Sequence, residues 1–137
     1  MSQEELRVQS QITFLYYHNL EPVDRFYGKV MGFELVEDQG FARIYRVSDN
    51  AFVGVVTGER GFHRPQEKSA VLITFVVQDV YGWYDYLKSQ SVKLLTGIKE
   101  AETIQVRGFF AEDPGGYSIE IQQFLNPKVA RAFGAES

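Results

Sequence analysis

Apolar and polar residues alternate in the last third of the chain, between residues 117 and 122. The odd positions are apolar and the even ones polar: Tyr117, Ile119 and Ile121 against Ser118, Glu120 and Gln122. A period of two predicts a β-strand with one packed face. A second strand-like run precedes it from Arg107, and the segment 113–116, with a proline and two glycines, is a turn sequence. We therefore predict a β-hairpin over 107–124 whose polar face carries Glu120 at its middle.

The same pattern predicts one helix and several strands in each half of the chain. In the first half, Asn19 is a good N-cap for an amphipathic helix that ends at Gly32. In the second half, Asp79 caps a helix with apolar residues at helical spacing. Strands are expected from Gln11 to about residue 17 and over 33–37, 41–47, 51–57, 70–77 and 92–96, before the hairpin. Residues 1–10 are polar and expected to be frayed.

These elements form an internal repeat. An offset of 60 residues sets Ile12 on Leu72 and also sets the cap Asn19 on the cap Asp79. The chain therefore reads as a single α+β domain with two copies of strand-helix-strand-strand-strand. The predicted parts are a first module over about 11–57, a linker over about 58–69, a second module over about 70–124 and a C-terminal tail over 125–137.

Composition narrows the possible functions. The chain has no cysteine, which excludes thiolate catalysis and cysteine-based metal sites. Its net charge is −4 with scattered basic residues, so nucleic acid is not an expected partner. The N-terminal residues do not resemble a signal peptide, and no apolar run approaches the roughly 20 residues of a membrane span. We expect a soluble, cytoplasmic protein without a membrane partner.

Three sets of residues could carry chemistry, and each also has a simpler interpretation. Alternation alone makes Glu120 either a solvated strand carboxylate or a site residue. His18 shares a strand face with Tyr16 and is either a helix flank or part of a site. His63 and Arg64 belong to the linker and form either a mobile surface pair or a lid.

Two motifs resemble those of the vicinal-oxygen-chelate superfamily, which includes glyoxalase I, extradiol dioxygenases, and fosfomycin- and bleomycin-resistance proteins. The segment from Asn19 to Phe33 is similar to the family's "D-L-x-x-S-x-x-F-Y … L-G-F". The segment from Phe109 to Glu120, FFAEDPGGYSIE, is similar to its "F-x-x-D-P-D-G-N-x-I-E". The resemblance runs from about Gln11 to Phe124 and implies two βαβββ modules that form a cup-shaped mixed sheet with helices outside.

The resemblance also implies which side chains face the cup. Beside Glu120 as a candidate catalytic residue, the candidate ligand-binding residues are Ile12, Phe14, Tyr16, His18, Leu72, Thr74, Val76, Ser118 and Gln122. Many family members hold a divalent metal at four places, which fall here on Ile12, about Gly54, Leu72 and Glu120. Only Glu120 has a donor side chain, whereas a catalytic metal needs about three protein ligands. We therefore expect neither a metal nor another cofactor.

Three functions stay open on the sequence. The first is a metal-free protein of the bleomycin-resistance kind that binds a small apolar or planar molecule. The second is a lyase, isomerase or dioxygenase of the same superfamily that uses Glu120 as a base or as a metal ligand. The third is an interaction module that uses the sheet or the segment from Pro127 to Phe133. A homodimer is expected from the resemblance.

Overall fold

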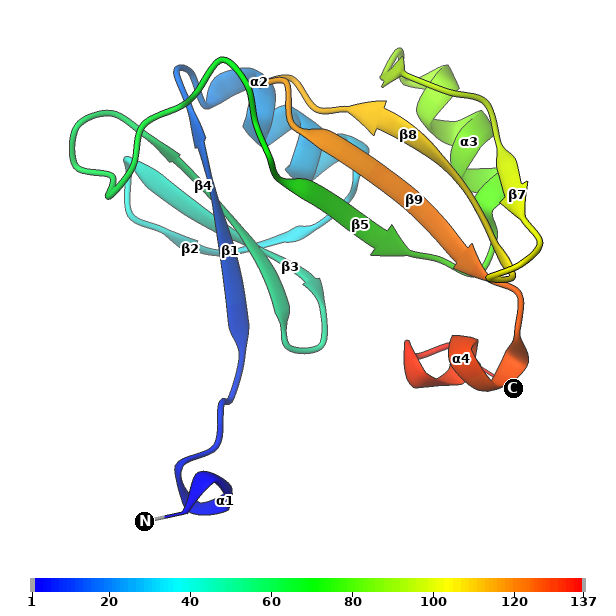
Figure 1. Ribbon diagram of the computed structural model, residues 1–137. Helices are drawn as coiled ribbons and strands as arrows, with labels where there is room; N and C mark the ends of the chain where they lie inside the picture. The colour runs from blue at the N-terminus through cyan, green and yellow to red at the C-terminus, as the bar shows by residue number, and fades with distance from the viewer. Residues whose placement is uncertain (1, 137) are drawn as a thin grey trace. The chain divides into compact units, whose positions relative to one another are not determined.

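The computed structural model describes residues 2–136 and shows an α+β chain (Figure 1). The chain divides into two compact parts, residues 1–67 (unit 1) and residues 68–137 (unit 2). Each unit has its own mixed β-sheet, and in each sheet the first strand runs parallel to the last. The predicted fold class and the predicted repeat of strand, helix and strands are both confirmed.

Unit 1 contains a four-stranded sheet with the order β1-β4-β3-β2. Its strands are β1 (Gln11–Tyr17), β2 (Glu34–Asp38), β3 (Ala42–Ser48) and β4 (Ala51–Thr57). Short turns connect β2, β3 and β4, and these strands pair antiparallel. The helix lies between β1 and β2, and this longer connection allows the last strand, β4, to pair parallel to β1. All four strands were predicted to within one or two residues.

The helix of unit 1 consists of α2 (Glu21–Asp24) and the π-helical turn η1 (Arg25–Val30). The side chain of Asn19 accepts a hydrogen bond from the backbone N–H of Glu21 at 3.1 Å, as its predicted cap role requires. Gly32 ends the helix at φ +75°, where the N–H of Phe33 donates to the carbonyl of Tyr27. The π-helical turn was not predicted, since apolar spacing does not distinguish it from α-helix.

Unit 2 contains β5 (Leu72–Val76), α3 (Val80–Ser89), β6 (Lys93–Leu94), β7 (Lys99–Ala101), β8 (Val106–Glu112), β9 (Ser118–Phe124) and α4 (Pro127–Ala132). The strands run in the order β5-β9-β8-β6, and β7 also pairs with β8. Asp79 caps α3 as predicted, accepting from the N–H of Gly82 at 3.0 Å. Of the strand expected over 92–96, only the two residues of β6 form a strand, and β7 follows outside this range.

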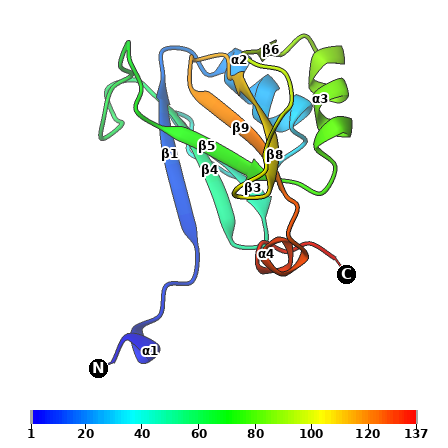
Figure 2. The same ribbon diagram turned by 45° about the vertical axis from the view of Figure 1, so that its right-hand side comes forward.

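The odd positions of β5, β8 and β9 form the packed face of unit 2. In unit 2, Phe109, Ile119 and Ile121 are at most 1% exposed. They lie on the face of the sheet that α3 covers (Figure 2). There Tyr84 packs edge-on against Phe109, with 5.1 Å between ring centroids. In unit 1, Leu15 and Tyr17 are likewise buried. In unit 2 the even positions therefore face away from α3, as the alternation predicted, whereas in unit 1 the even positions Ala42, Ile44 and Val56 are buried as well.

The two ends of the described chain are helical. A single exposed turn, α1 (Gln3–Leu6), precedes β1, so the expected fraying over residues 1–10 differs from the structure there. The side chain of Ser2 accepts from the N–H of Glu5 and caps this turn. The tail that follows β9 contains α4, which begins after the cap residue Asn126. Within residues 2–136, no helix is long and apolar enough to cross a membrane.

Candidate functional site

Glu120 lies on the face of the unit 2 sheet that is opposite α3. It is half-buried, and strand pairing sets it opposite Thr74 on β5 and Phe110 on β8. The hydroxyl of Thr74 donates to Oε1 of Glu120 at 2.9 Å, and the amide of Gln122 donates to Oε2 at 3.4 Å. Each carboxylate oxygen therefore has one neighbouring donor, and the side chain is held in one orientation while it stays accessible.

The neighbours of Glu120 on this face are apolar and open. Leu72, Val76 and Phe110 are 49%, 36% and 37% exposed, and the register places all three on the face of Glu120. Ser118 and Gln122 share this face and are half-buried. The structure thus brings together the six predicted residues of unit 2, and it adds Phe110. The hairpin around residues 113–116 was sufficient to find Phe110, because its register sets residue 110 opposite residue 120.

The corresponding face of unit 1 is aromatic. Ile12 and Phe14 are 40% and 41% exposed, and Tyr16 is half-buried on the same side of β1. Strand pairing sets Phe14 opposite Gly54, as it sets Thr74 opposite Glu120 in unit 2. A Cβ atom on residue 54 would lie 2.4 Å from Cδ1 of Phe14, so the ring fills the space above Gly54. The repeat therefore holds an aromatic-glycine pair in one unit and a hydroxyl-carboxylate pair in the other.

This close approach gives a prediction for Gly54. Gly54→Ala should lower the free energy of unfolding of unit 1 by about 1–3 kcal/mol, because the added methyl group must displace the Phe14 ring. In a Phe14→Ala background the same change should cost much less, since the ring is gone. Urea unfolding followed by far-UV circular dichroism measures both differences. Equal costs of Gly54→Ala in the two backgrounds would contradict the contact.

The family's divalent metal does not fit these residues. Of the four places named from the sequence, Ile12, Gly54 and Leu72 offer no donor side chain, and the Phe14 ring occupies the space at Gly54. Among residues 2–136, no group of three or more His, Cys, Asp or Glu side chains is arranged to hold a metal ion. Only Glu120 could contribute a carboxylate, which is fewer than the about three protein ligands of a catalytic site.

The segment predicted as a linker forms an ordered loop on the aromatic face of unit 1. Gly61 lies against this face, where a Cβ atom would be 2.7 Å from Cγ1 of Val56 and 3.3 Å from Cε1 of Tyr16. The ring of His63 packs edge-on against Tyr16, with 5.5 Å between centroids. The guanidinium of Arg64 donates to the carbonyls of Gly61, His63 and Glu59 at 2.6, 2.9 and 2.9 Å. His63 thereby joins the face of Tyr16.

His18 has a different setting from the other candidate residues. It is exposed just beyond the end of β1, and its backbone carbonyl accepts a hydrogen bond from the hydroxyl of Thr57 at 3.0 Å. This bond ties the start of the helix connection to the end of β4. The contact belongs to the backbone and gives the imidazole no role.

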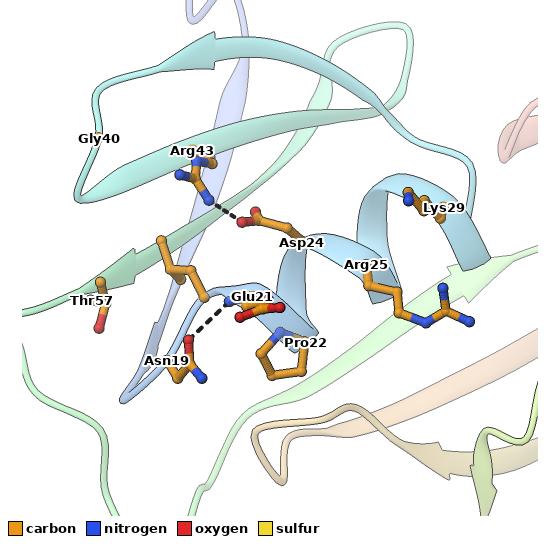
Figure 3. A pocket seen from close by; sticks show the side chains of 10 residues that line it. Asn19, Glu21, Pro22, Asp24, Arg25, Lys29, Gly40, Arg43 and Thr57 are labelled. Carbon is orange, nitrogen blue, oxygen red and sulfur yellow. Dashed lines mark hydrogen bonds and ion pairs between the residues drawn. The ribbon is translucent and has the colours of Figure 1, made fainter.

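A cavity of unit 1 opens between the start of its helix and the β2–β3 turn. Its volume is about 1030 Å³, and Asn19, Asp24, Lys29 and Arg43 are among its lining residues (Figure 3). The sequence did not predict it, because its walls come from a helix and a turn that are distant along the chain. The signal in the sequence was only that several of the lining residues, Asn19, Asp24 and Lys29 among them, lie within the first motif.

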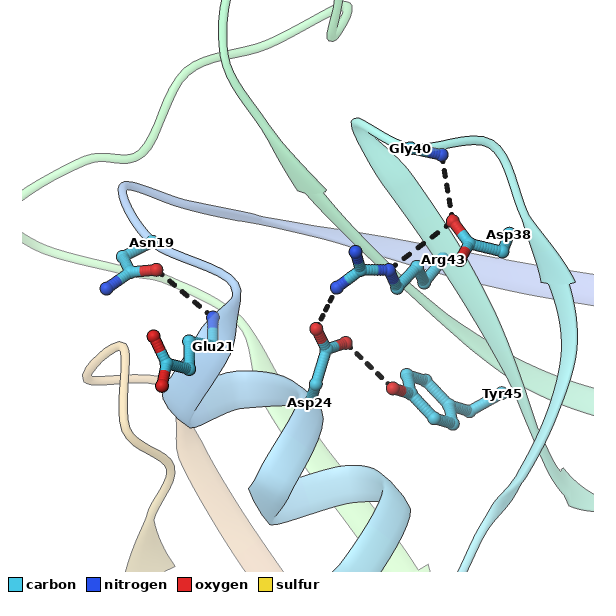
Figure 4. A network of polar contacts seen from close by, with 7 residues as sticks. All are labelled: Asn19, Glu21, Asp24, Asp38, Gly40, Arg43 and Tyr45. Carbon is cyan, nitrogen blue, oxygen red and sulfur yellow. Dashed lines mark hydrogen bonds and ion pairs between the residues drawn. The ribbon is translucent and has the colours of Figure 1, made fainter.

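Asp24 connects the helix to the sheet beside this cavity. One carboxylate oxygen forms an ion pair with Arg43, and the other accepts from the hydroxyl of Tyr45 at 2.7 Å (Figure 4). Burial, followed by the hydrogen bond to Asp24, raises the pKa of Tyr45 well above its usual range. Arg43 also contacts Asp38, whose pKa is lowered by the backbone N–H of Gly40 and by Arg43. The network contains two carboxylates and one guanidinium, and it ties the helix to the sheet.

The Glyoxalase/Bleomycin resistance protein/Dioxygenase superfamily model matches residues 11–121, which is most of the chain. The chain belongs to this superfamily. This superfamily member is similar to the crystal structure of TioX from Micromonospora sp. ML1, with 14% identity, 86% of this chain and 100% of that chain covered, and a TM-score of 0.71. No curated protein matched the chain.

Two further solved structures have the same fold. Lactoylglutathione lyase from Agrobacterium tumefaciens is 16% identical, with 85% of this chain and 94% of that chain covered and a TM-score of 0.67. Fosfomycin resistance protein FosX from Mesorhizobium loti is also 16% identical, with 89% of this chain and 96% of that chain covered and a TM-score of 0.65. At this level of identity the similarity establishes the fold, and function has to be argued from the residues.

Proposed function

We propose that this superfamily member binds a small planar or apolar molecule with a cationic group, and that it does so without a metal. The observation that carries the proposal is that the two units hold different side chains at the same position, the middle of the parallel pair formed by the first and last strands. In unit 2 this position holds a carboxylate oriented by Thr74, and in unit 1 it holds the Phe14 ring over Gly54. On the unit 2 face the carboxylate of Glu120 suits a cation, and the exposed ring of Phe110 opposite it suits a flat apolar surface.

The surroundings of both positions support this chemistry. Around Glu120 the exposed side chains of Leu72, Val76 and Phe110 provide apolar contact area. On the unit 1 face, Phe14 is joined by Tyr16, against which His63 packs. Ligand sites typically combine apolar and aromatic walls with a few oriented polar groups, and each face has this composition.

An enzyme that uses Glu120 as a general base is the second candidate. It is favoured by the hydrogen bond from Thr74, which orients the carboxylate while leaving it accessible. A base needs a substrate proton within hydrogen-bond reach, so turnover should vanish in Glu120→Gln while binding persists. The binding proposal instead expects loss of affinity in this variant without any product formed by the wild type.

Bleomycin is a suitable probe because it combines planar rings with cationic groups, and because the name of the superfamily includes bleomycin resistance proteins. Isothermal titration calorimetry should show saturable binding, and Glu120→Gln should weaken it about tenfold, the effect of roughly 1.4 kcal/mol. Glu112→Gln is the matched control, since Glu112 shares the face but already pairs with Lys93 at 2.9 Å. Equal weakening by both variants, or no effect of either, would contradict a specific role for Glu120.

Three expectations from the sequence stay predictions. Elemental analysis of untagged protein should find no stoichiometric metal, because only Glu120 of the four family positions has a donor side chain. Sedimentation at tens of micromolar should show a homodimer, the state expected of the superfamily. A cytoplasmic location is to be tested by fractionation.

A further inference from the structure

The carboxyl ends of two parallel strands meet at one edge of the unit 2 sheet. Strand β5 ends at Val76 and β9 ends at Phe124, and the chain continues from them into α3 and α4. Figures 1 and 2 both place α4 beyond the end of β9. In open sheets with parallel strands, ligands bind in crevices outside the carboxyl ends where successive helices leave toward different faces.

The two helices of unit 2 leave in this manner. Helix α3 covers the packed face, where Tyr84 contacts Phe109. Helix α4 is followed by Phe133, whose ring stacks on Phe124 with 4.7 Å between centroids and 9° between planes. Since Phe124 alternates with the buried positions and pairs with Val106, its ring leaves the sheet on the face of Glu120.

A cavity of about 400 Å³ lies between these elements. Its lining includes three aromatic side chains, from Trp83 of α3, Phe124 of β9 and Phe133 after α4, together with the amide side chains of Gln78 and Gln123. Phe133 is 57% exposed and Val76 is 36% exposed, so both apolar side chains are open to solvent at the cavity. The volume lies within the range of roughly 300–1,000 Å³ that is typical of small-molecule pockets.

One charged side chain lines this cavity among the described residues, and it is the acidic Glu136. The backbone N–H of Glu136 donates to Oε1 of Gln78 at 3.5 Å, which ties the C-terminal segment to the residues after β5. The side-chain oxygen of Gln123 is occupied by the N–H of Val80. Aromatic walls beside a single carboxylate favour a flat, apolar, positively charged ligand.

We propose that this cavity is a second small-molecule site, which binds a bicyclic aromatic amine between Trp83 and the stacked pair Phe124 and Phe133. The amine would lie toward Glu136 and the rings would lie against the aromatic walls. The site is separate from the hydrogen-bonded pair of Thr74 and Glu120, and it shares only Val76 with the candidate residues named from the sequence. Its occupancy therefore does not depend on the function proposed for Glu120.

The chain's single tryptophan gives a direct test, since Trp83 yields one indole N–H resonance. Titration of the full chain with 1-naphthylmethylamine should shift this resonance saturably, with a dissociation constant below 1 mM, a modest affinity for a ligand of this size. Phe133→Ala should weaken binding at least tenfold. Phe62→Ala is the matched control, because Phe62 is 88% exposed in unit 1 and should leave binding unchanged.

Two further measurements keep the result interpretable. Ala130→Arg places bulk and positive charge in the cavity and should abolish the shift of the Trp83 resonance. An unchanged midpoint of thermal unfolding shows that the Phe133→Ala and Ala130→Arg proteins are folded. Binding of 1-naphthoic acid should be at least threefold weaker than that of the amine, since its charge opposes Glu136. A shift that does not saturate, a folded Phe133→Ala protein that binds like the wild type, or equal binding of the acid would overturn the proposal.

Discussion

Replacement of Asp113 by alanine should destabilise unit 2 by about 3 kcal/mol, because hydrogen bonds to a charged acceptor contribute about 1.5–3 kcal/mol each. Asp113 is only 4% exposed. Its Oδ1 accepts from the backbone N–H groups of Gly115 and Tyr117, both at 2.9 Å. Alanine leaves both donors of the turn without this partner. Urea unfolding followed through Trp83, which lies in unit 2, measures the loss.

Asparagine at position 113 is the control for this prediction. It keeps a side-chain oxygen where Oδ1 accepts both bonds, so Asp113→Asn should cost about 1 kcal/mol, the difference between a charged and a neutral acceptor. Equal destabilisation by alanine and asparagine would show that the stability comes from the negative charge and not from the two hydrogen bonds.

The turn around Asp113 has a functional consequence through register. It joins β8 to β9 so that Glu112 pairs with Ser118, and this sets Phe110 opposite Glu120. A slip by one residue would turn Glu120 to the packed face and Ile119 to the open one. The second motif of the resemblance is therefore a structural turn, which supports the candidate site by positioning it.

Most of the fold was predictable because its determinants are local. The caps Asn19 and Asp79 each accept a nearby backbone N–H, and Gly32 ends its helix in the left-handed conformation that glycine favours. The alternation of residues 117–122 predicted which side chains would be buried. The resemblance then supplied what alternation could not, namely which face of the sheets to examine for a site.

The features that were missed depend on contacts between distant residues. Asp24 contacts Arg43 and Tyr45 because the helix packs against β3, which follows it about 20 residues later in the chain. The loop over residues 58–64 reads in the sequence as a polar linker. The guanidinium of Arg64 stabilises it by donating to backbone carbonyls, and hydrogen bonds to backbone carbonyls leave no pattern in the sequence. The stacked pair of Phe124 and Phe133 likewise joins residues whose spacing follows neither strand nor helix period.

The difference between the two units explains why the sequence could identify the superfamily and still leave the ligand open. Both units keep the parallel pairing of first and last strands that sets the repeated position. The side chains at this position have diverged from each other, to Phe14 and Gly54 in one unit and Thr74 and Glu120 in the other. Packing constrains the buried odd positions of unit 2 and also Gly54 beneath the Phe14 ring, whereas Glu120 and Phe110 are partly exposed and less constrained.

Two neighbouring phenylalanines test this separation of stability from binding. Phe109→Ala should lower the free energy of unfolding of unit 2 by about 3–5 kcal/mol, because a fully buried ring leaves a cavity. Phe109 is 1% exposed and packs against Tyr84, whereas Phe110 is 37% exposed and lies opposite Glu120. Phe110→Ala should therefore cost less than about 1 kcal/mol, the usual range for a surface position.

The binding measurement should give the opposite order. Phe110→Ala should weaken bleomycin binding about five- to tenfold, since an aromatic contact contributes about 0.5–1.5 kcal/mol beyond the area that it buries. Phe109→Ala should leave affinity unchanged at temperatures where the variant is still folded, because its side chain points to α3. Urea unfolding through Trp83 and titration calorimetry separate the two effects. If Phe110→Ala proved the more destabilising variant, or left bleomycin affinity at the wild-type value, the open face of β8 would have no part in ligand binding.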